Sequence, residues 1–263
     1  MKDKKILFFD IDGTLITDDE RRILPEDAKE ALSKAKEAGC LLFINTGRVF
    51  ANVEDYIKEG FDGLVCGCGT YIVYHDEVLL HHKQSKEKCH EIALVCREKG
   101  METVFEYADR SCYDKTLKMN YCTDLIRYFK DNNRWVVDDI DSPDFIFDKL
   151  SAFYDDNSDL NGFREYIEKE WTYIDREGNF CEIEPKGFSK ASGIKFLMEH
   201  FGIPEENVYV FGDSNNDIEM LGAVKNSVAM GNATLSCKEI ASYVTTNVDC
   251  GGISNAMKYF GLI

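Results

Sequence analysis

Positive charge is scarce in this sequence of 263 residues, which has 31 Lys and Arg against 48 Asp and Glu. The formal net charge of −17 argues against non-specific electrostatic binding to nucleic acid or to an anionic membrane. Long apolar runs are also missing: none approaches the roughly 18 residues of a membrane-spanning helix. The run 6–9 is too short for the core of a signal peptide. We therefore expect a soluble, cytoplasmic protein without nucleic-acid or membrane partners.

The ten cysteines lack the paired spacings of a metal or redox motif. None form C-x-x-C, and the closest pair, Cys66 and Cys68, has no second pair at zinc-finger spacing. Several lie in apolar surroundings, such as Cys40 before "LLFI", where a free thiol packs as a small hydrophobic side chain. These positions favour reduced, structural thiols over disulfides, and over a redox role for Cys66 and Cys68.

Strands and helices alternate at both ends of the chain. In the first third, the apolar patterns predict strands at 5–10, 40–47 and 62–69 and helices over 24–39 and 48–60. The last third returns to this style, with predicted strands at 207–213 and 227–231 and helices over 188–202, 216–224 and 251–261. Strand–helix–strand units of this length predict a parallel sheet with right-handed crossovers.

The middle of the chain has a different pattern. Hairpins are predicted over 70–82 and 171–185, and helices over 85–100, 121–132 and 161–170. The simplest organisation is an α/β fold: a doubly wound, Rossmann-like parallel-sheet core formed by residues 1–83 and 188–263, interrupted by an α+β domain over 84–187. The sequence predicts no particular oligomeric state.

Polar residues follow four of the predicted core strands. Ligands of open α/β sheets bind at the carboxyl ends of the strands, so these residues are expected to meet along one edge. They are Asp10 with Asp12, Thr46-Gly47-Arg48, the turn Gly67-Cys68-Gly69, and the stretch "GDSNND" that ends at Asp217.

Four acids would share that edge: Asp10, Asp12, Asp213 and Asp217. Such a cluster is costly unless a cation sits among the acids, and ligands that are all oxygen atoms suit Mg²⁺. Mg²⁺ in turn usually brings a substrate phosphate with it. The sequence therefore predicts a magnesium and phosphate site.

Nearby groups could bind and transfer a phosphoryl group. The Thr46 hydroxyl, the Asn216 amide and the Lys190 ammonium, at a helix start, could hold its oxygens. Asp10 could attack phosphorus, and Asp12 could donate a proton to the leaving oxygen and later accept one from water. Each stretch alone is more often an ordinary turn, cap or surface residue; their joint occurrence, in order after strands, favours the site.

The stretches "FFDIDGTL", "INTGR", "KGFSK" and "FGDSNND" resemble the four motifs of the haloacid dehalogenase-like (HAD) hydrolases. The insertion over 84–187 resembles the α/β cap of the Cof-type subfamily, the sugar-phosphate phosphatases. The resemblance implies a Mg²⁺-dependent phosphatase acting on small phosphorylated metabolites, with sugar phosphates foremost, through an aspartyl-phosphate intermediate.

The resemblance also implies a role for each motif residue. Asp10 would be the nucleophile and Asp12 the general acid/base. Mg²⁺ would be held by the Asp10 carboxylate, the Asp12 backbone carbonyl and Asp213. Asp217 would not bind the metal directly but would support its water ligands or Lys190. Thr46, Gly47, Lys190 and Asn216 would bind phosphate. Two positions depart from the subfamily pattern: Cys68 stands where Asn is frequent, and Ala191 where Gly is common.

Substrate choice is expected to come from the inserted domain. Candidates are Arg48, His75, Glu182 and Glu184, with Tyr113, Tyr121 and Phe188 as walls, although surface or core positions are the commoner setting for such residues. Two other functions stay open. A phosphomannomutase-like phosphomutase would return the phosphoryl group to substrate, and a phospholigand sensor would bind without catalysis. The presence of both Asp10 and Asp12 argues against the sensor.

Overall fold

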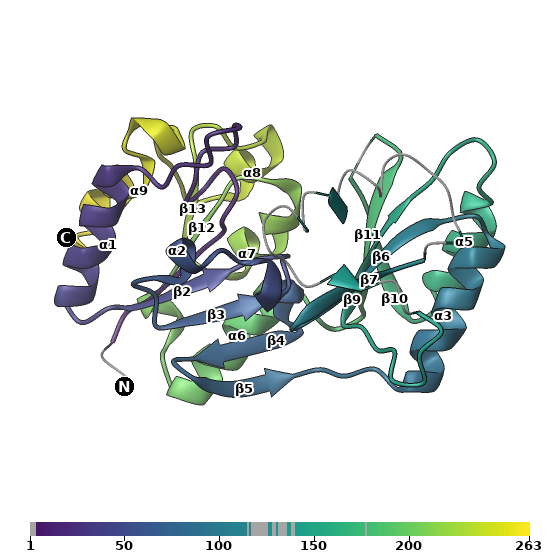
Figure 1. Cartoon of the computed structure of the whole chain (residues 1–263). Helices are drawn as coiled ribbons and strands as arrows, with labels where there is room; N and C mark the ends of the chain where they lie inside the picture. The colour runs from purple at the N-terminus through teal and green to yellow at the C-terminus, as the bar shows by residue number, and fades with distance from the viewer. Residues whose placement is uncertain are drawn as a thin grey trace. The chain divides into compact units, whose positions relative to one another are not determined.

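The computed structural model describes residues 4–114, 116, 126–127, 130, 136–137, 140–176 and 178–263 (Figure 1). The chain divides into two compact units. The first unit comprises Met1–Gly47, Glu54–Leu80 and Ser189–Ile263, and the second comprises Arg48–Val53 and His81–Phe188. The domain limits predicted from the sequence, at residues 83/84 and 187/188, stay a prediction.

The first unit is built on an eight-stranded sheet with the order β14-β13-β12-β1-β2-β3-β4-β5. Its strands are β1 (Ile6–Phe9), β2 (Leu41–Asn45), β3 (Gly63–Cys66), β4 (Tyr71–Tyr74), β5 (Glu77–His81), β12 (Val208–Gly212), β13 (Asn226–Ala229) and β14 (Tyr243–Val244). The six strands from β14 to β3 pair in parallel, and β4 is antiparallel to β3. The α/β class with a parallel core sheet is therefore confirmed, as is the hairpin over 70–82.

Every residue of β1, β2 and β12 is buried. Strands buried on both faces require cover on both sides of the sheet, which explains their nearly continuous apolar sequences. One group of helices in this unit is α1 (Glu26–Glu37) and α9 (Gly252–Tyr259), which contact each other. Another is α6 (Lys190–Phe201), α7 (Ile218–Ala223) and α8 (Leu235–Ile240), with contacts from α6 to α7 and from α7 to α8.

The single helix predicted over 48–60 is wrong. The structure has a 3₁₀ turn, η1 (Phe50–Asn52), and a separate one-turn helix, α2 (Asp55–Lys58). The backbone between them is extended, with φ −92° and ψ 125° at Val53 and φ −66° and ψ 142° at Glu54. In the turn, the Ala51 N–H donates to the Ala108 carbonyl at 2.8 Å. This hydrogen bond anchors the turn separately, and the extended residues that follow it prevent the turn from continuing into α2.

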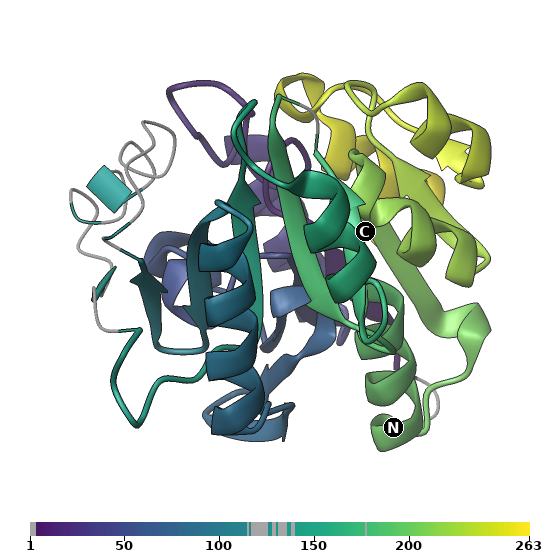
Figure 2. The same ribbon diagram turned by 90° about the vertical axis from the view of Figure 1, so that its right-hand side faces the viewer.

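The second unit has a six-stranded sheet with the order β10-β11-β9-β6-β7-β8. Its strands are β6 (Glu102–Tyr107), β7 (Arg110–Tyr113), β8 (Val136–Val137), β9 (Lys149–Phe153), β10 (Trp171–Asp175) and β11 (Phe180–Pro185). Helices α3 (Lys86–Glu98) and α5 (Leu160–Ile167) lie side by side on one face (Figures 1 and 2). Phe105, Phe147, Phe163 and Trp171 belong to the core. The hairpin over 171–185 is confirmed, whereas the helix predicted over 121–132 falls mainly outside the described residues.

Candidate active site

The loops that carry the predicted site follow neighbouring strands of the first unit. Strand β1 lies between β2 and β12, parallel to both, and β3 is the next parallel strand beyond β2. Asp10 follows β1, Thr46 follows β2, and Asp213 follows β12. Because the carboxyl ends of parallel strands share one edge, segments that are distant in the sequence meet there.

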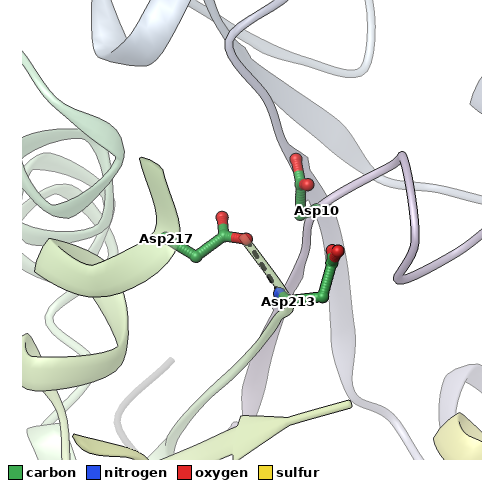
Figure 3. Close-up of side chains that lie close together, drawn as sticks. All are labelled: Asp10, Asp213 and Asp217. Atoms are coloured by element: carbon green, nitrogen blue, oxygen red, sulfur yellow. Dashed lines mark hydrogen bonds between the residues drawn. The ribbon is translucent and has the colours of Figure 1, made fainter. Parts of the chain in front are cut away.

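Three carboxylates gather at this edge: Asp10, Asp213 and Asp217 (Figure 3). Each offers an oxygen atom, and the three atoms lie within 4.8 Å of one another. Asp10 is 6% exposed and Asp217 is fully buried. An all-oxygen set of this kind suits a hard divalent cation.

Lys190 supplies the positive charge in the described part of this cluster. Its Nζ lies 2.7 Å from Asp10 Oδ1, 2.5 Å from Asp217 Oδ1 and 3.3 Å from Asn216 Oδ1. The lysine is the first residue of α6, whose N-terminus is closed by a reciprocal Ser189–Ser192 capping box. The Asn45 side chain donates to the Lys190 carbonyl at 3.0 Å. The helix start and the end of β2 therefore position the ammonium together.

The pKa values reflect an excess of negative charge. Burial, with the Asp217 carboxylate as the next cause, raises the pKa of Asp10 to about 7, against the lowering effect of Lys190. Burial and the charges of Asp10 and Asp217 raise the pKa of Asp213 to about 8. Burial alone would lower the pKa of Lys190, but Asp10 and Asp217 raise it instead. Asp10 and Asp213 thus hold a proton more readily than ordinary carboxyl groups, and a divalent cation would supply the positive charge that the cluster lacks.

The oxygen atoms of the cluster are unequally engaged. Asp217 binds Lys190 through Oδ1, while its Oδ2 accepts the N–H groups of Asp213 at 2.9 Å and Ser214 at 3.0 Å. Asp213 Oδ1 accepts the Thr14 hydroxyl at 2.8 Å. Within the described ranges, neither Asp10 Oδ2 nor Asp213 Oδ2 accepts a hydrogen bond. Asp10 and Asp213 are therefore the members that best fit a metal ligand role.

The Asp12 carboxylate, expected at the same edge as the other three acids, does not belong to their cluster as the structure describes it. The cluster that could hold a metal contains three of the four acids, and Asp12 is not a member within the described part of the chain. Its Oδ1 lies 2.9 Å from Arg22 Nη2, and its side chain is 38% exposed. Strand β1 ends at Phe9, and Gly13 turns the chain with φ +77°, so strand alternation does not extend to Asp12.

The predicted phosphate-binding residues border the same edge. Thr46 is buried; its N–H donates to the Val65 carbonyl at 2.8 Å, and its own carbonyl accepts the Cys68 N–H at 3.1 Å. Gly47 directly follows it. Asn216 Oδ1 accepts the Ser214 hydroxyl at 2.7 Å besides facing Lys190. Because its N–H is already used, Thr46 would meet a phosphate through its hydroxyl.

Sequence reasoning assigned no role to Thr14, Arg22, Asn45 or Asn232. Thr14 had a signal, since it belongs to the "DGTL" stretch, and its hydroxyl holds Asp213. The Asn232 side chain donates to the Gly13 carbonyl at 2.7 Å and so supports the turn after Asp12. Nothing in the pattern around Asn232 indicated this contact.

The predicted specificity residues are distributed over both units. His75 is exposed at the turn between β4 and β5 in the first unit. Arg48, Tyr113, Glu182, Glu184 and Phe188 belong to the second unit. There Glu184 is buried, Lys149 Nζ lies 3.4 Å from Glu182 Oε1, and the ring of Phe188 lies against that of His82 with the ring planes tilted. Tyr121 lies outside the described residues.

A parallel α/β sheet with three carboxylates and a lysine at its carboxyl edge has the layout of an α/β enzyme whose ligand binds beyond the strand ends, and the all-oxygen cluster could hold a hard cation. The family can also be stated. The chain belongs to the haloacid dehalogenase-like hydrolases, whose family model matches residues 7–257. The assignment to the Cof type is confirmed as well. Among the described residues, no helix is long and apolar enough to cross a membrane.

Relatives match almost the whole chain. The Bacillus subtilis protein YkrA, which carries a provisional phosphatase name, is 29% identical over 276 residues, covering 99% of both chains. A phosphoglycolate phosphatase of Methanobrevibacter smithii is 28% identical and covers 96% of this chain and 97% of its own. The solved structure of the HAD subclass IIB sugar phosphatase BT4131 is 29% identical with a TM-score of 0.81, covering 99% and 100%. The chain is thus a HAD-like phosphatase, as its motifs predicted.

Proposed function

We propose that the protein is a Mg²⁺-dependent phosphomonoester hydrolase that acts on small phosphorylated metabolites, in particular sugar phosphates, through an aspartyl-phosphate intermediate. One observation carries the proposal: the Lys190 ammonium lies 2.7 Å from Asp10 Oδ1 and 2.5 Å from Asp217 Oδ1. A buried nucleophile and a buried cation side by side are what transfer of a phosphoryl group requires.

Asp10, Asp213 and the backbone carbonyl of Asp12 would hold the magnesium ion, and Asp217 would support the site through Lys190. Asp10 and Asp213 suit this role because each has an oxygen that accepts no hydrogen bond in the described part of the chain. When bound, Mg²⁺ neutralises charge on the phosphoryl oxygens.

The reaction has two halves. First, an Asp10 carboxylate oxygen bonds to phosphorus, the bond from phosphorus to the ester oxygen breaks, and Asp12 gives that oxygen a proton. The alcohol then leaves, and Asp10 carries the phosphoryl group. In the second half Asp12 takes a proton from water, the water oxygen bonds to phosphorus, and phosphate departs from Asp10.

Binding of the phosphoryl group falls to the surrounding loops. The Thr46 hydroxyl, the Gly47 N–H, the Asn216 amide and the Lys190 ammonium would hold its oxygens. Lys190 is fully buried, so its charge acts in a weakly screened environment and counts for more than that of a surface lysine.

The relatives support this substrate class by similarity alone. BT4131 is described as a sugar phosphatase, whereas the Methanobrevibacter relative is named a phosphoglycolate phosphatase. We propose sugar phosphates as the first class to test, and residues 84–187 as an inserted cap domain that selects among them. We also retain the prediction that the protein is cytoplasmic.

The test is a phosphate-release screen of phosphorylated metabolites, including sugar phosphates and phosphoglycolate, with and without Mg²⁺. We expect turnover that chelation abolishes and that Asp10→Asn lowers to background. Exposed Asp249 gives the matched control, because Asp249→Asn makes the same chemical change away from the cluster. Normal turnover by Asp10→Asn would refute the mechanism. Isomerisation of a sugar phosphate that depends on a sugar bisphosphate would favour a phosphomutase, and binding without turnover a sensor.

A further inference from the structure

A loop over residues 17–23, closed by hydrogen bonds between its two ends, lies in the first unit a few residues after Asp12. The Thr17 N–H donates to the Ile23 carbonyl at 3.0 Å, and the Ile23 N–H donates to Thr17 Oγ1 at 3.0 Å. The Thr17 hydroxyl in turn donates to Asp19 Oδ1 at 2.9 Å. The ends of the loop are thus closed on each other, which restricts the conformations of the residues between them.

Arg22 lies in this loop with a constrained backbone. Its φ of +47° is a left-handed conformation that residues other than glycine rarely adopt. The Arg22 N–H donates to the Asp19 carbonyl at 3.1 Å, and the Arg22 carbonyl accepts the Tyr56 hydroxyl at 3.1 Å. Both backbone groups of Arg22 are therefore held, one by its own loop and one by α2.

The held side chain reaches Asp12. Arg22 Nη2 lies 2.9 Å from Asp12 Oδ1 and 3.8 Å from Glu54 Oε1. The Nη2 atom is buried, although the side chain as a whole is 28% exposed, and it donates no hydrogen bond to the described residues. The pairing with Asp12 is therefore an attraction between charges, partly shielded from water, on a side chain whose backbone is constrained.

The location of this pair has a chemical consequence. Asp12 is two residues from Asp10, and a divalent cation would attract its carboxylate as it attracts those of Asp10 and Asp213. A carboxylate taken up as a metal ligand cannot reach the leaving oxygen or the attacking water. A fixed guanidinium gives Asp12 another partner of opposite charge.

We propose that Arg22 is a positioning residue: it holds the Asp12 carboxylate apart from the Asp10–Asp213–Asp217 cluster, in place for proton transfer. The inference rests on the role proposed for Asp12. It predicts that loss of the guanidinium affects the steps that use Asp12 and leaves the folded state intact.

The experiment compares an alkyl phosphate, whose leaving group needs a proton, with 4-nitrophenyl phosphate, whose leaving group does not. Asp12→Asn should lose far more activity on the alkyl ester. Arg22→Asn removes the guanidinium and places a residue that tolerates positive φ. It should shift the ratio of the two kcat/KM values, which report the steps up to departure of the leaving group, in the same direction by about 10-fold, with an unchanged melting temperature.

Three further variants sharpen the result. Arg22→Lys keeps the charge and should recover part of the ratio. Arg21→Asn is the matched control, because Arg21 sits in the same loop and pairs with Asp19 instead. In an Asp12→Asn background, Arg22→Asn should change activity by less than about 2-fold, since its effect passes through Asp12.

The outcomes separate the two proposals. If Asp12→Asn changes the ratio and neither Arg22→Asn nor Arg22→Lys does, the inference about Arg22 is overturned. An Arg22→Asn loss of equal size in the Asp12→Asn background would also overturn it. If Asp12→Asn lowers kcat/KM equally for both esters, the role of Asp12 as the acid for the leaving oxygen fails instead. Should Arg22→Asn not fold, Tyr56→Phe, which releases the Arg22 carbonyl, gives a second measurement of the same ratio.

Discussion

Lys190 Nζ lies 2.5 Å from Asp217 Oδ1, and both side chains are fully buried. Through its other oxygen Asp217 accepts the N–H groups of Asp213 and Ser214. One carboxylate therefore joins the start of α6 to the loop after β12. The relative positions of the ammonium and the Asp213 carboxylate depend on this residue.

Asp217→Asn tests that dependence through stability. The amide cannot balance the charge of Lys190, and removal of one partner of a buried ion pair typically costs about 3–5 kcal/mol. Asp10 also pairs with Lys190, so we expect the lower end of that range, measured as the free energy of unfolding in urea. Glu239→Gln, at an exposed position, is the control and should be nearly neutral. A cost below about 1 kcal/mol for Asp217→Asn would contradict the prediction.

Thr14→Val tests the support of Asp213. The substitution keeps the shape of the side chain but removes the hydroxyl that donates to Asp213 Oδ1 at 2.8 Å. Loss of a hydrogen bond to a metal-binding carboxylate usually weakens metal affinity by about 10- to 100-fold. The Mg²⁺ dependence of turnover should shift accordingly, whereas Thr14→Ser, which retains the hydroxyl, should resemble wild type. Equal Mg²⁺ affinities for the Val and Ser variants would count against the assigned contact.

Gly69→Ala tests the close approach of the turn after β3 to the start of α6. Gly69 has φ +92°, and an added Cβ would lie 2.6 Å from the Ser189 backbone oxygen. Gly39→Ala is a matched control, because Gly39 has φ +87° and a Cβ added there would meet no described atom within 4 Å. Both variants carry the conformational cost of about 1 kcal/mol. Gly69→Ala should lose more stability than the control and also reduce turnover, because Lys190 follows Ser189.

Titration of the cluster should be visible in metal-free protein. The pKa of Asp213 is raised to about 8, so the folded state retains a proton that the unfolded state has already lost. That contribution to stability is fully present below the ordinary pKa of Asp, near 4, and is lost as the pH rises through about 8. In chelator, wild type should therefore lose stability relative to Asp213→Asn between these pH values. If the free energies of unfolding of the two proteins varied with pH in parallel, the raised pKa of Asp213 would be contradicted. Added Mg²⁺ should restore the lost stability in wild type and not in Asp213→Asn.

The sequence was informative wherever local pattern and chemistry agreed. Buried strands ending in Asp10, Thr46 and Asp213 predicted both the parallel sheet and the edge where polar groups meet. Lys190 was expected near this edge as a phosphate-binding group, whereas its hydrogen bond to Asp10 is seen only in the structure.

Other features depend on tertiary contacts that leave no local pattern. The helix expected over 48–60 is interrupted by extended backbone at Val53 and Glu54, after a turn in which the Ala51 N–H bonds to Ala108. The partner of Asp12, Arg22, lies in an irregular polar loop without periodicity. Likewise, the short elements α8 and β14 follow β13 in a stretch too weakly patterned to be assigned from its own residues.

The Thr14–Asp213 hydrogen bond joins residues 199 positions apart, and this separation bears on synthesis. A nascent chain exposes β1 long before β12, its neighbour in the sheet, leaves the ribosome. Because loop closure over such a distance comes late, β1 can pair only with β2 until β12 has been synthesised. The three acids are consequently brought together only near the end of synthesis, so early folding proceeds without their mutual repulsion.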